Sequence, residues 1–219
     1  GDLDAFVGEG FGNTFFYKNL GTASNPIFAA AIINPFGLTN AGFYINSAFV
    51  DIDGDADLDV FVGNSEGKII FSRNTGTASA PVFAPSTINP FGLSDVGSYA
   101  DPSLVDIDGD ADLDAFVSNS DGNILFFRNT GTISAPVFAS ALMNPFGLSD
   151  AGGVFASITL VDTDDDGDLD AFVGNVDGDT LYFKNTGTVN SPIFATAAFN
   201  PFGLNDVESN ASPAFADID

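Results

Sequence analysis

The chain repeats itself with a period of about 55 residues. The segment Asn-Pro-Phe-Gly-Leu begins at Asn34, Asn89, Asn144 and Asn200, at intervals of 55, 55 and 56 residues. Asn-Thr-Gly-Thr and Pro-Val/Ile-Phe-Ala segments keep the same register. Self-similarity at a fixed period of this size indicates a repeat architecture in which each repeat is one supersecondary unit. The chain is therefore expected to be a stack of equivalent units.

The register divides the chain into four units within a single repeat domain, 1–219. The units are approximately residues 1–46, 47–101, 102–157 and 158–213. Residues 214–219 are expected to start the next unit or to close a ring. Because Gly1-Asp2-Leu3-Asp4 matches the end of a segment that occurs whole three times later, we expect the chain to be an excerpt of a longer polypeptide.

Each unit contains four short segments of strand-like composition. In the second unit these segments are residues 47–50, 59–63, 68–72 and 81–84. They are rich in Val, Ile and Phe and are separated by Gly, Asn, Asp and Pro, which is typical of strands. A Glu66-Gly67 turn, replaced by Asp-Gly in later units, predicts a hairpin between the middle two segments.

The second segment is apolar on both alternating faces, as in Asp-Val-Phe-Val-Gly, so both faces should be covered. Small four-stranded sheets that stack face to face form propeller blades. A β-sandwich is the main rival, but it does not generate a repeat of this period. We predict an all-β, β-propeller-type array of four four-stranded blades, with Phe61, Phe116 and Phe172 in the core and Asn-Pro-Phe-Gly-Leu as a turn with a buried Phe.

Aspartate is concentrated in three loops between the first two strand segments of a unit. Two loops read Asp-Ile-Asp-Gly-Asp-Ala-Asp-Leu-Asp and the third reads Asp-Thr-Asp-Asp-Asp-Gly-Asp-Leu-Asp. Calcium binds six to eight oxygens at 2.3 to 2.6 Å, and carboxylates at positions 1, 3, 5 and 9 with a carbonyl at position 7 can surround one ion. Magnesium fits less well, because it prefers few carboxylates and strict octahedral geometry.

Two other calcium loops are excluded by the pattern. An EF-hand needs Glu at position 12, where these loops have Val62, Val117 or Val173. The nine-residue Gly-Gly repeat of β-rolls is absent. A solvated acidic turn is the remaining alternative, but twenty of the 30 acidic residues lie in the three loops and at the chain ends, and such crowding requires a cation.

The predicted sites are three complete calcium sites and a fourth that is split between the chain ends. The assigned residues of the complete sites are Asp51, Asp53, Asp55, Asp57, Asp59, Asp106, Asp108, Asp110, Asp112, Asp114, Asp162, Asp164, Asp166, Asp168 and Asp170. The split site combines Asp217 and Asp219 with Asp2 and Asp4, and it lacks one ligand. It could form within a ring or between successive chains.

The charge of the chain restricts its partners. The formal net charge is -25, which excludes nucleic acid and anionic membrane surfaces as natural partners. No run of about 18 apolar residues occurs, so direct membrane insertion is not expected. Histidine and cysteine are absent, which removes the commonest general base and the thiol nucleophile. Asp95, Asp150 and Asp206 occupy one repeat position and are interpreted as turn residues, so no catalytic cluster is predicted.

The loops at Asp51, Asp106 and Asp162, with the strands after them, resemble the FG-GAP or VCBS-type calcium-binding repeat of integrin-like β-propellers. The resemblance implies a propeller with calcium loops between the first two strands of each blade. It also implies an extracellular adhesion, lectin or surface-associated module. Such propellers usually close with about seven blades, so four units leave open a closed ring, half of a larger assembly or part of an open array.

Three hypotheses about function follow from the sequence. The first is a non-catalytic, calcium-stabilised structural or adhesion module, secreted or at the cell surface, that binds calcium and itself, or a surface protein or glycan. The second is a calcium-dependent lectin that uses Asn74, Asn129 and Asn185 for glycans. The absence of Trp weakens the lectin hypothesis, and these asparagines are more simply explained as turn caps. An enzyme with paired carboxylates is the third and least favoured hypothesis.

Overall fold

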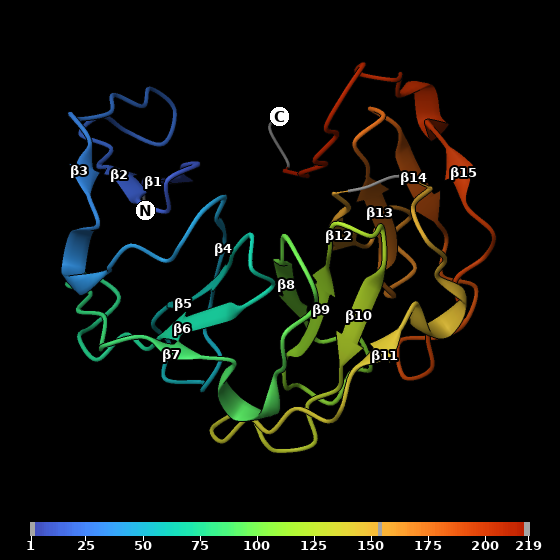
Figure 1. The fold of residues 1–219 in the computed structure, drawn as a ribbon, viewed down its shortest axis with the longest axis horizontal. Helices are drawn as coiled ribbons and strands as arrows, with labels where there is room; N and C mark the ends of the chain where they lie inside the picture. The colour runs from blue at the N-terminus through green and yellow to red at the C-terminus, as the bar shows by residue number, and fades with distance from the viewer. Residues whose placement is uncertain (1–2, 153–154, 217–219) are drawn as a thin grey trace.

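The structure is a computed structural model that describes residues 3–152 and 155–216. Its strands form four small antiparallel sheets that follow one another along the chain (Figure 1). Three sheets have four strands, and the first has three among the described residues. Four 3-10 turns, each of three residues, are the helical elements of this part of the chain. The predicted all-β propeller-type array of four blades is confirmed.

Each blade is built from strands that are consecutive in the chain. The first blade consists of β1 (Ala5–Gly8), β2 (Thr14–Tyr17) and β3 (Ile32–Ile33). The second consists of β4 (Asn46–Val50), β5 (Asp59–Gly63), β6 (Ile69–Ser72) and β7 (Thr87–Ile88). The third consists of β8 (Asp101–Val105), β9 (Asp114–Ser118), β10 (Ile124–Phe127) and β11 (Leu142–Met143). The fourth consists of β12 (Ser157–Val161), β13 (Asp170–Gly174), β14 (Thr180–Phe183) and β15 (Ala198–Phe199).

The first three predicted strands of the second unit are confirmed, and the fourth prediction is wrong. The outer strand is β7, whereas the predicted segment 81–84 contributes an isolated bridge between Phe83 and Asn74. Pro81 cannot donate to a ladder. The backbone N–H of Phe83 donates instead to the carbonyl oxygen of Phe36 in the preceding blade, at 2.8 Å. This segment therefore joins two blades and does not complete one.

The core lies between successive blades. All five residues of β5, β9 and β13 are buried, which confirms that these strands are covered on both faces. Phe61, Phe116 and Phe172 are each at most 1% exposed, as predicted. Two of the three apolar clusters combine residues of two neighbouring sheets, such as Phe61 of β5 with Val117 of β9. The blades therefore stabilise one another through face-to-face packing.

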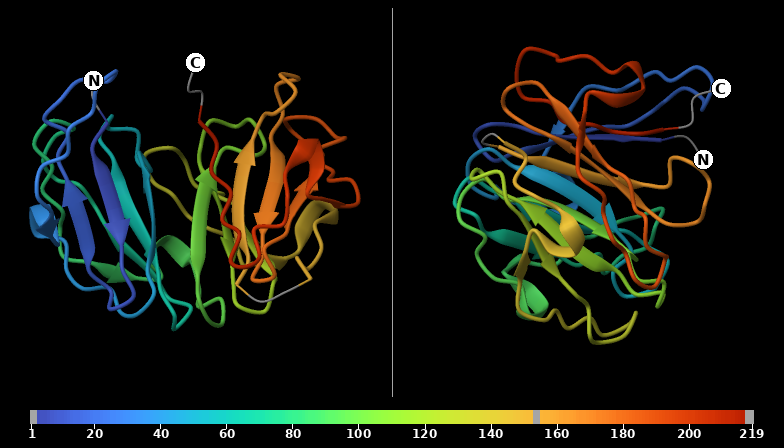
Figure 2. Two further views of the ribbon diagram at one scale, coloured as in Figure 1. Left: turned by 90° about the horizontal axis from the view of Figure 1, so that it is seen from above. Right: turned by 90° about the vertical axis from the view of Figure 1, so that its right-hand side faces the viewer.

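The inner strands β4, β8 and β12 line a central channel. Figure 2 shows the blades from the side, with their antiparallel strands aligned roughly along one common axis. Residues 212–216 are in register with these inner strands but form no strand. They lie against β12, where the Thr159 hydroxyl donates to the carbonyl oxygen of Pro213 at 2.7 Å and Phe215 stacks on Phe172 with ring centroids 4.5 Å apart.

The Asn-Pro-Phe-Gly-Leu segments form the four 3-10 turns, at Pro35–Gly37, Pro90–Gly92, Pro145–Gly147 and Pro201–Gly203. Each begins at an Asn in the left-handed region, such as Asn34 with φ +47°, whose side-chain oxygen accepts the backbone N–H of Thr14 at 2.8 Å. The predicted turn is confirmed, but the prediction that its Phe is buried is wrong. The Phe of the turn is half-buried in the first three units, but Phe202 is 75% exposed, because no described blade follows it.

Candidate metal centre

The three aspartate loops connect β4 to β5, β8 to β9 and β12 to β13, so all three lie at the same end of the inner strands. In the second, third and fourth blades the last residue of the inner strand pairs with the ninth residue of the loop, as Val50 pairs with Asp59. This pairing brings the first and last loop positions together. An ion bound within the loop would therefore hold the first two strands of a blade to each other.

The first aspartate of each loop folds the loop around itself. The Asp51 carboxylate accepts the backbone N–H groups of Gly54 at 2.8 Å, Asp55 at 3.2 Å and Ala56 at 2.9 Å. Gly54 has φ +73° and Ala56 has φ +71°, so the loop passes twice through the left-handed region. The second loop repeats this arrangement around Asp106. The loop geometry is set by its own sequence, through Asx-type hydrogen bonds.

The first, third and fifth positions of each loop bring their carboxylates together. One oxygen from each lies within 4.8 Å of the others in the clusters Asp51–Asp53–Asp55, Asp106–Asp108–Asp110 and Asp162–Asp164–Asp166. Oxygens that share a calcium ion at 2.3 to 2.6 Å are at most about 5 Å apart. The spacing of these predicted ligands therefore fits a single calcium ion.

The ninth position of every loop and the seventh position of the first two loops are buried rather than solvated. Asp57 is 8% exposed and Asp59 is 1% exposed. One oxygen of Asp59 accepts the backbone N–H of Asn74 at 2.6 Å, and its other oxygen has no partner. Buried carboxylate oxygens without a hydrogen-bond partner in the described part of the chain belong to Asp53, Asp57, Asp59, Asp108, Asp112, Asp114 and Asp168. All seven lie in the three loops.

These unpartnered oxygens favour a bound cation. Burial, with a smaller contribution from the neighbouring loop carboxylates, raises the pKa of Asp59 to about 6 and that of Asp114 to about 7. A buried anion without a partner is costly, and a divalent cation removes that cost. The residues present therefore fit calcium. Calcium would supply charge neutralisation and a fixed link between the loop and the second strand.

The third loop differs from the other two at its ninth position. The second oxygen of Asp170 accepts hydrogen bonds from the Tyr182 hydroxyl, at 2.9 Å, and from the Thr163 hydroxyl. The second and third blades have Phe and Ile at the positions of Tyr182 and Thr163. Asp170 is therefore already satisfied within the protein. The third loop offers fewer free oxygens to an ion than the first two.

A basic residue faces each loop, and the sequence analysis missed it. Arg73 pairs with Asp53 and lies 3.7 Å from Asp55, and Arg128 pairs with Asp108 and Asp110 at 2.5 and 3.7 Å. Lys184 pairs with Asp164 in the third loop. These residues directly precede the Asn of Asn-Thr-Gly-Thr, and with Lys18 they account for four of the five basic residues of the chain. That shared register position was the available signal.

Replacing Arg128 with Gln should increase calcium affinity at the second loop by roughly three- to tenfold, because a positive charge beside the site opposes a divalent ion. The ion-free chain should lose at most about 1 kcal/mol, since exposed ion pairs contribute little. Calorimetric titration of the variant with calcium measures both quantities when combined with denaturation. Lys68→Gln, which removes a charge paired with Glu66 outside the loops, is the control. An equal change of calcium affinity in both variants would rule out a local effect of Arg128 on the second loop.

The asparagines considered as glycan ligands are turn caps. Asn74, Asn129 and Asn185 are each 2% exposed. The Asn129 side-chain oxygen accepts the backbone N–H groups of Gly131 and Val137, both at 3.0 Å, and the other two repeat this pattern. The capping interpretation is confirmed. These side chains are not available to a glycan.

Replacing Asn129 with Ala should destabilise the chain by about 2–3 kcal/mol, because the backbone N–H groups of Gly131 and Val137 lose their acceptor in a partly buried turn. The denaturant midpoint of unfolding, followed by circular dichroism, measures this loss. Asn205→Ala, at an exposed asparagine with a single weak contact to the carbonyl oxygen of Gly203, should change it little. Equal effects would show that the cap contributes nothing specific.

The split fourth site falls mostly outside the described residues, which exclude 1–2 and 217–219. Of its predicted ligands, only Asp4 can be placed. Its carboxylate accepts the backbone N–H of Asn19 at 2.7 Å, as Asp59 does with Asn74. Asp4 therefore occupies the ninth loop position of the first blade. The split site itself stays a prediction.

Comparison with known proteins agrees with this geometry. Residues 51–117, which span two of the three loops, match the family model of the FG-GAP-like repeat. With the four-bladed fold, this match supports an FG-GAP-type propeller and confirms the resemblance seen in the sequence. No curated protein matched the chain. Among residues 3–152 and 155–216, no helix is long and apolar enough to cross a membrane.

Proposed function

We propose that this chain is a calcium-stabilised, non-catalytic repeat module of a secreted or surface protein, which assembles with a second copy of itself through its end blades. The observation that carries the calcium part is the set of seven buried, unpartnered carboxylate oxygens, all within three equivalent loops. An unfilled loop of this kind is strained by its own charge. A filled loop joins two strands of a blade.

The assembly part rests on the contrast between inner and end blades. In the second, third and fourth blades one Phe contacts the turn of the preceding blade and is only 4 to 6% exposed; these residues are Phe83, Phe138 and Phe194. Phe28, at the same repeat position in the first blade, is 49% exposed. Phe202, at the far end of the array, is 75% exposed, although the equivalent residues are half-buried. The two end faces are therefore complementary halves of the interface that the inner blades form three times.

The joining geometry is set by the inner blades. There the backbone N–H of Phe83 donates to the carbonyl oxygen of Phe36 at 2.8 Å, and the backbone N–H of Phe138 donates to the carbonyl oxygen of Phe91 at 2.7 Å. The equivalent pair at the ends is Phe28 with Phe202. A head-to-tail contact between two copies would reproduce this bond and bury both rings. Such heterologous contacts generate either closed rings or open filaments.

Two features support a non-catalytic role. The metal-type clusters in the described residues are the three loops, which are structurally equivalent. Two of the acids at the repeat position interpreted as a turn do serve turns, since Asp95 accepts the backbone N–H of Gly97 at 2.9 Å and Asp150 accepts that of Gly152 at 2.8 Å. Extracellular calcium is concentrated enough to fill sites of the weaker class, which supports a location outside the cell.

The test is the molar mass of the chain by light scattering after gel filtration, in millimolar calcium and after chelation. A larger species in calcium that dissociates on chelation supports the proposal. A single-chain mass under both conditions overturns self-assembly. If chelation also leaves the melting temperature unchanged, calcium stabilisation is overturned as well.

Matched variants locate the contact. Phe28→Ser and Phe202→Ser each remove one ring from an end face and should abolish the larger species. Phe11→Ser removes a ring that is 73% exposed, comparable to Phe202, from the β1–β2 turn and should leave assembly intact. Loss of assembly in all three variants would indicate nonspecific hydrophobic association.

A further inference from the structure

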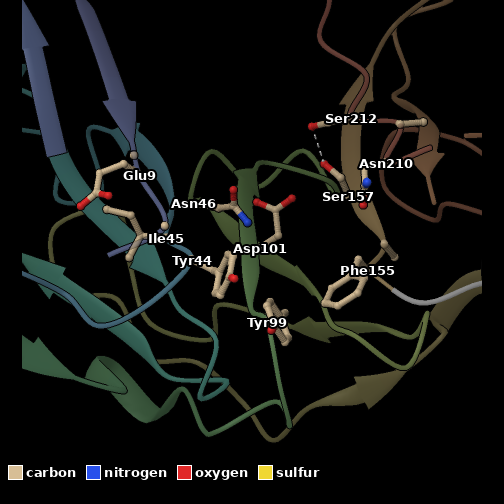
Figure 3. Close-up of a pocket in the computed structure, with 14 residues that line it drawn as sticks. Glu9, Tyr44, Ile45, Asn46, Tyr99, Asp101, Phe155, Ser157, Asn210 and Ser212 are labelled. Atoms are coloured by element: carbon tan, nitrogen blue, oxygen red, sulfur yellow. Dashed lines mark hydrogen bonds between the residues drawn. The ribbon is translucent and has the colours of Figure 1, made fainter. Parts of the chain in front are cut away.

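The face opposite the aspartate loops holds a funnel at the mouth of the central channel. Its volume is about 520 Å³, within the range of small-molecule sites. Figure 3 shows that it is lined by the residues that open the inner strands and by the short segments before them. Because β8 extends from Asp101 to Val105 and the loop follows at Asp106, the funnel floor and the second loop are separated by roughly 16 Å.

Three aromatic rings form one wall of the funnel. Tyr44, Tyr99 and Phe155 occupy one repeat position in successive blades. The ring centroids of Tyr44 and Tyr99 are 5.5 Å apart, and those of Tyr99 and Phe155 are 4.4 Å apart at 86°. Tyr44 is 59% exposed and Phe155 is 38% exposed, so their faces are open to a ligand.

The backbone at these aromatic residues is in an unfavourable conformation. Tyr44, Tyr99 and Phe155 have φ values of +50°, +55° and +59°, in the left-handed region that bulky residues avoid. The fourth unit has Asn210 there, with φ +52°, and Asn adopts this region more readily. Strained residues that persist in a fold cluster at binding sites. The conformation points the rings toward the funnel.

The floor of the funnel carries a single carboxylate. Asn46, Asp101 and Ser157 begin the inner strands, Ser212 occupies the same repeat position, and all four residues also line the channel below. The Asp101 side chain points into the space between the blades (Figure 3). The other acid in the lining, Glu9, is used by its own turn, where it accepts hydrogen bonds from Phe11 and Asn13. The lining contains no basic residue.

We propose that this funnel binds a small organic ammonium ion, with its charge on Asp101 and its alkyl groups against Tyr44, Tyr99 and Phe155. Aromatic faces attract weakly hydrated cations, and rings cannot coordinate a hard metal ion that needs several oxygens. An anionic ligand would face Asp101 without a counter-charge. The proposal is independent of the calcium loops and of assembly.

The test compares choline with 3,3-dimethylbutanol, its neutral isostere, by ligand-observed NMR and calorimetry on the full chain in calcium. Choline should bind at least about tenfold more tightly, as expected for cation–π and ionic contacts together. Equal binding of the two compounds overturns the proposal, as does binding of neutral sugars with no binding of choline. The latter result would assign the funnel to a glycan.

The roles of Asp101 and Tyr99 can be tested by substituting the residues that other blades have at the same repeat positions. Asp101→Asn, which copies Asn46, should weaken choline binding by about tenfold or more, whereas Asp121→Asn removes an exposed charge outside the funnel and should not. Tyr99→Asn, which copies Asn210, should also abolish binding, and Tyr99→Phe, which copies Phe155, should retain it. Unchanged binding in Asp101→Asn overturns the assignment.

Acid pH provides a second readout. Burial raises the pKa of Asp101 to about 6, and the other titratable groups of the lining are Glu9, Tyr44 and Tyr99. Choline keeps its charge at all pH values, so protonation of Asp101 should weaken binding as pH falls from 7 to 5. Asp101→Asn should remove this dependence. A pH profile that is the same in wild type and variant contradicts the role of Asp101.

Discussion

Calcium should raise the melting temperature of this chain by more than about 15 °C. Each loop filled at 100 times its dissociation constant adds about 2.7 kcal/mol, so three independent loops add about 8 kcal/mol. For a chain of this size each 1 kcal/mol corresponds to roughly 2–4 °C. The effect is large because the ion-free loops carry buried carboxylates that repel one another, and a single ion neutralises several of them.

Differential scanning calorimetry in 5 mM calcium, 5 mM magnesium and chelator measures this effect. Magnesium should produce a much smaller shift, because it retains its waters and requires octahedral geometry. In the chain without calcium, the basic residues that face the loops, such as Arg73, neutralise part of the charge of the loop carboxylates. They therefore limit how far the melting temperature falls after chelation. A melting temperature that is equal in calcium and chelator would contradict the metal assignment of all three loops.

The blade architecture could be predicted because the period fixes it. A 55-residue repeat with two-faced apolar strands has few ways to cover both faces of each small sheet, and stacking is the simplest. Phe61 and its equivalents were assigned to the core because they recur at one position of a strand whose neighbours are also apolar. The loop ligands were predicted from spacing alone, and the structure brings the carboxylates of the first, third and fifth loop positions together.

The errors arose where tertiary contacts override local pattern. Segment 81–84 has strand composition, but Phe83 bonds to Phe36 of another blade, and the sequence does not show which partner a backbone group selects. Tyr182 satisfies Asp170 from a strand 12 residues away, which spacing in the loop could not indicate. The shared register position of Arg128 and its equivalents was visible in the sequence, but the loop carboxylates that they pair with were not. The repeat position of Tyr99 likewise did not show that its ring lines a funnel.

The second large effect concerns Asp114, whose replacement by Asn should act in opposite directions with and without calcium. Asp114 is 1% exposed, one of its oxygens is unpartnered, and burial raises its pKa to about 7. In the ion-free chain its charge opposes folding, whereas Asn is neutral and can still accept the backbone N–H of Asn129. Asp114→Asn should therefore stabilise the ion-free chain at pH 8 by roughly 2–4 kcal/mol, since each pKa unit is worth about 1.4 kcal/mol.

The pH dependence of this gain gives the sign test. A carboxyl whose folded pKa lies above its unfolded value favours folding when protonated, and that contribution is lost as pH rises from about 4 through 7. The gain from Asp114→Asn should therefore vanish near pH 4 and grow toward pH 8. Denaturation midpoints in calcium-free buffer at several pH values measure it. Asp121→Asn, at an exposed turn, should show no such trend.

In calcium the same substitution should reduce the stabilisation that the ion provides. The second loop loses the charged ligand that ties it to β9, so the calcium-dependent increase in unfolding free energy should fall by about one third, the share of one site in three. Calorimetric titration should show one weakened site and two unchanged sites. If Asp114→Asn destabilises the ion-free chain, or leaves all three sites intact, Asp114 is a structural hydrogen-bond acceptor and not a ligand.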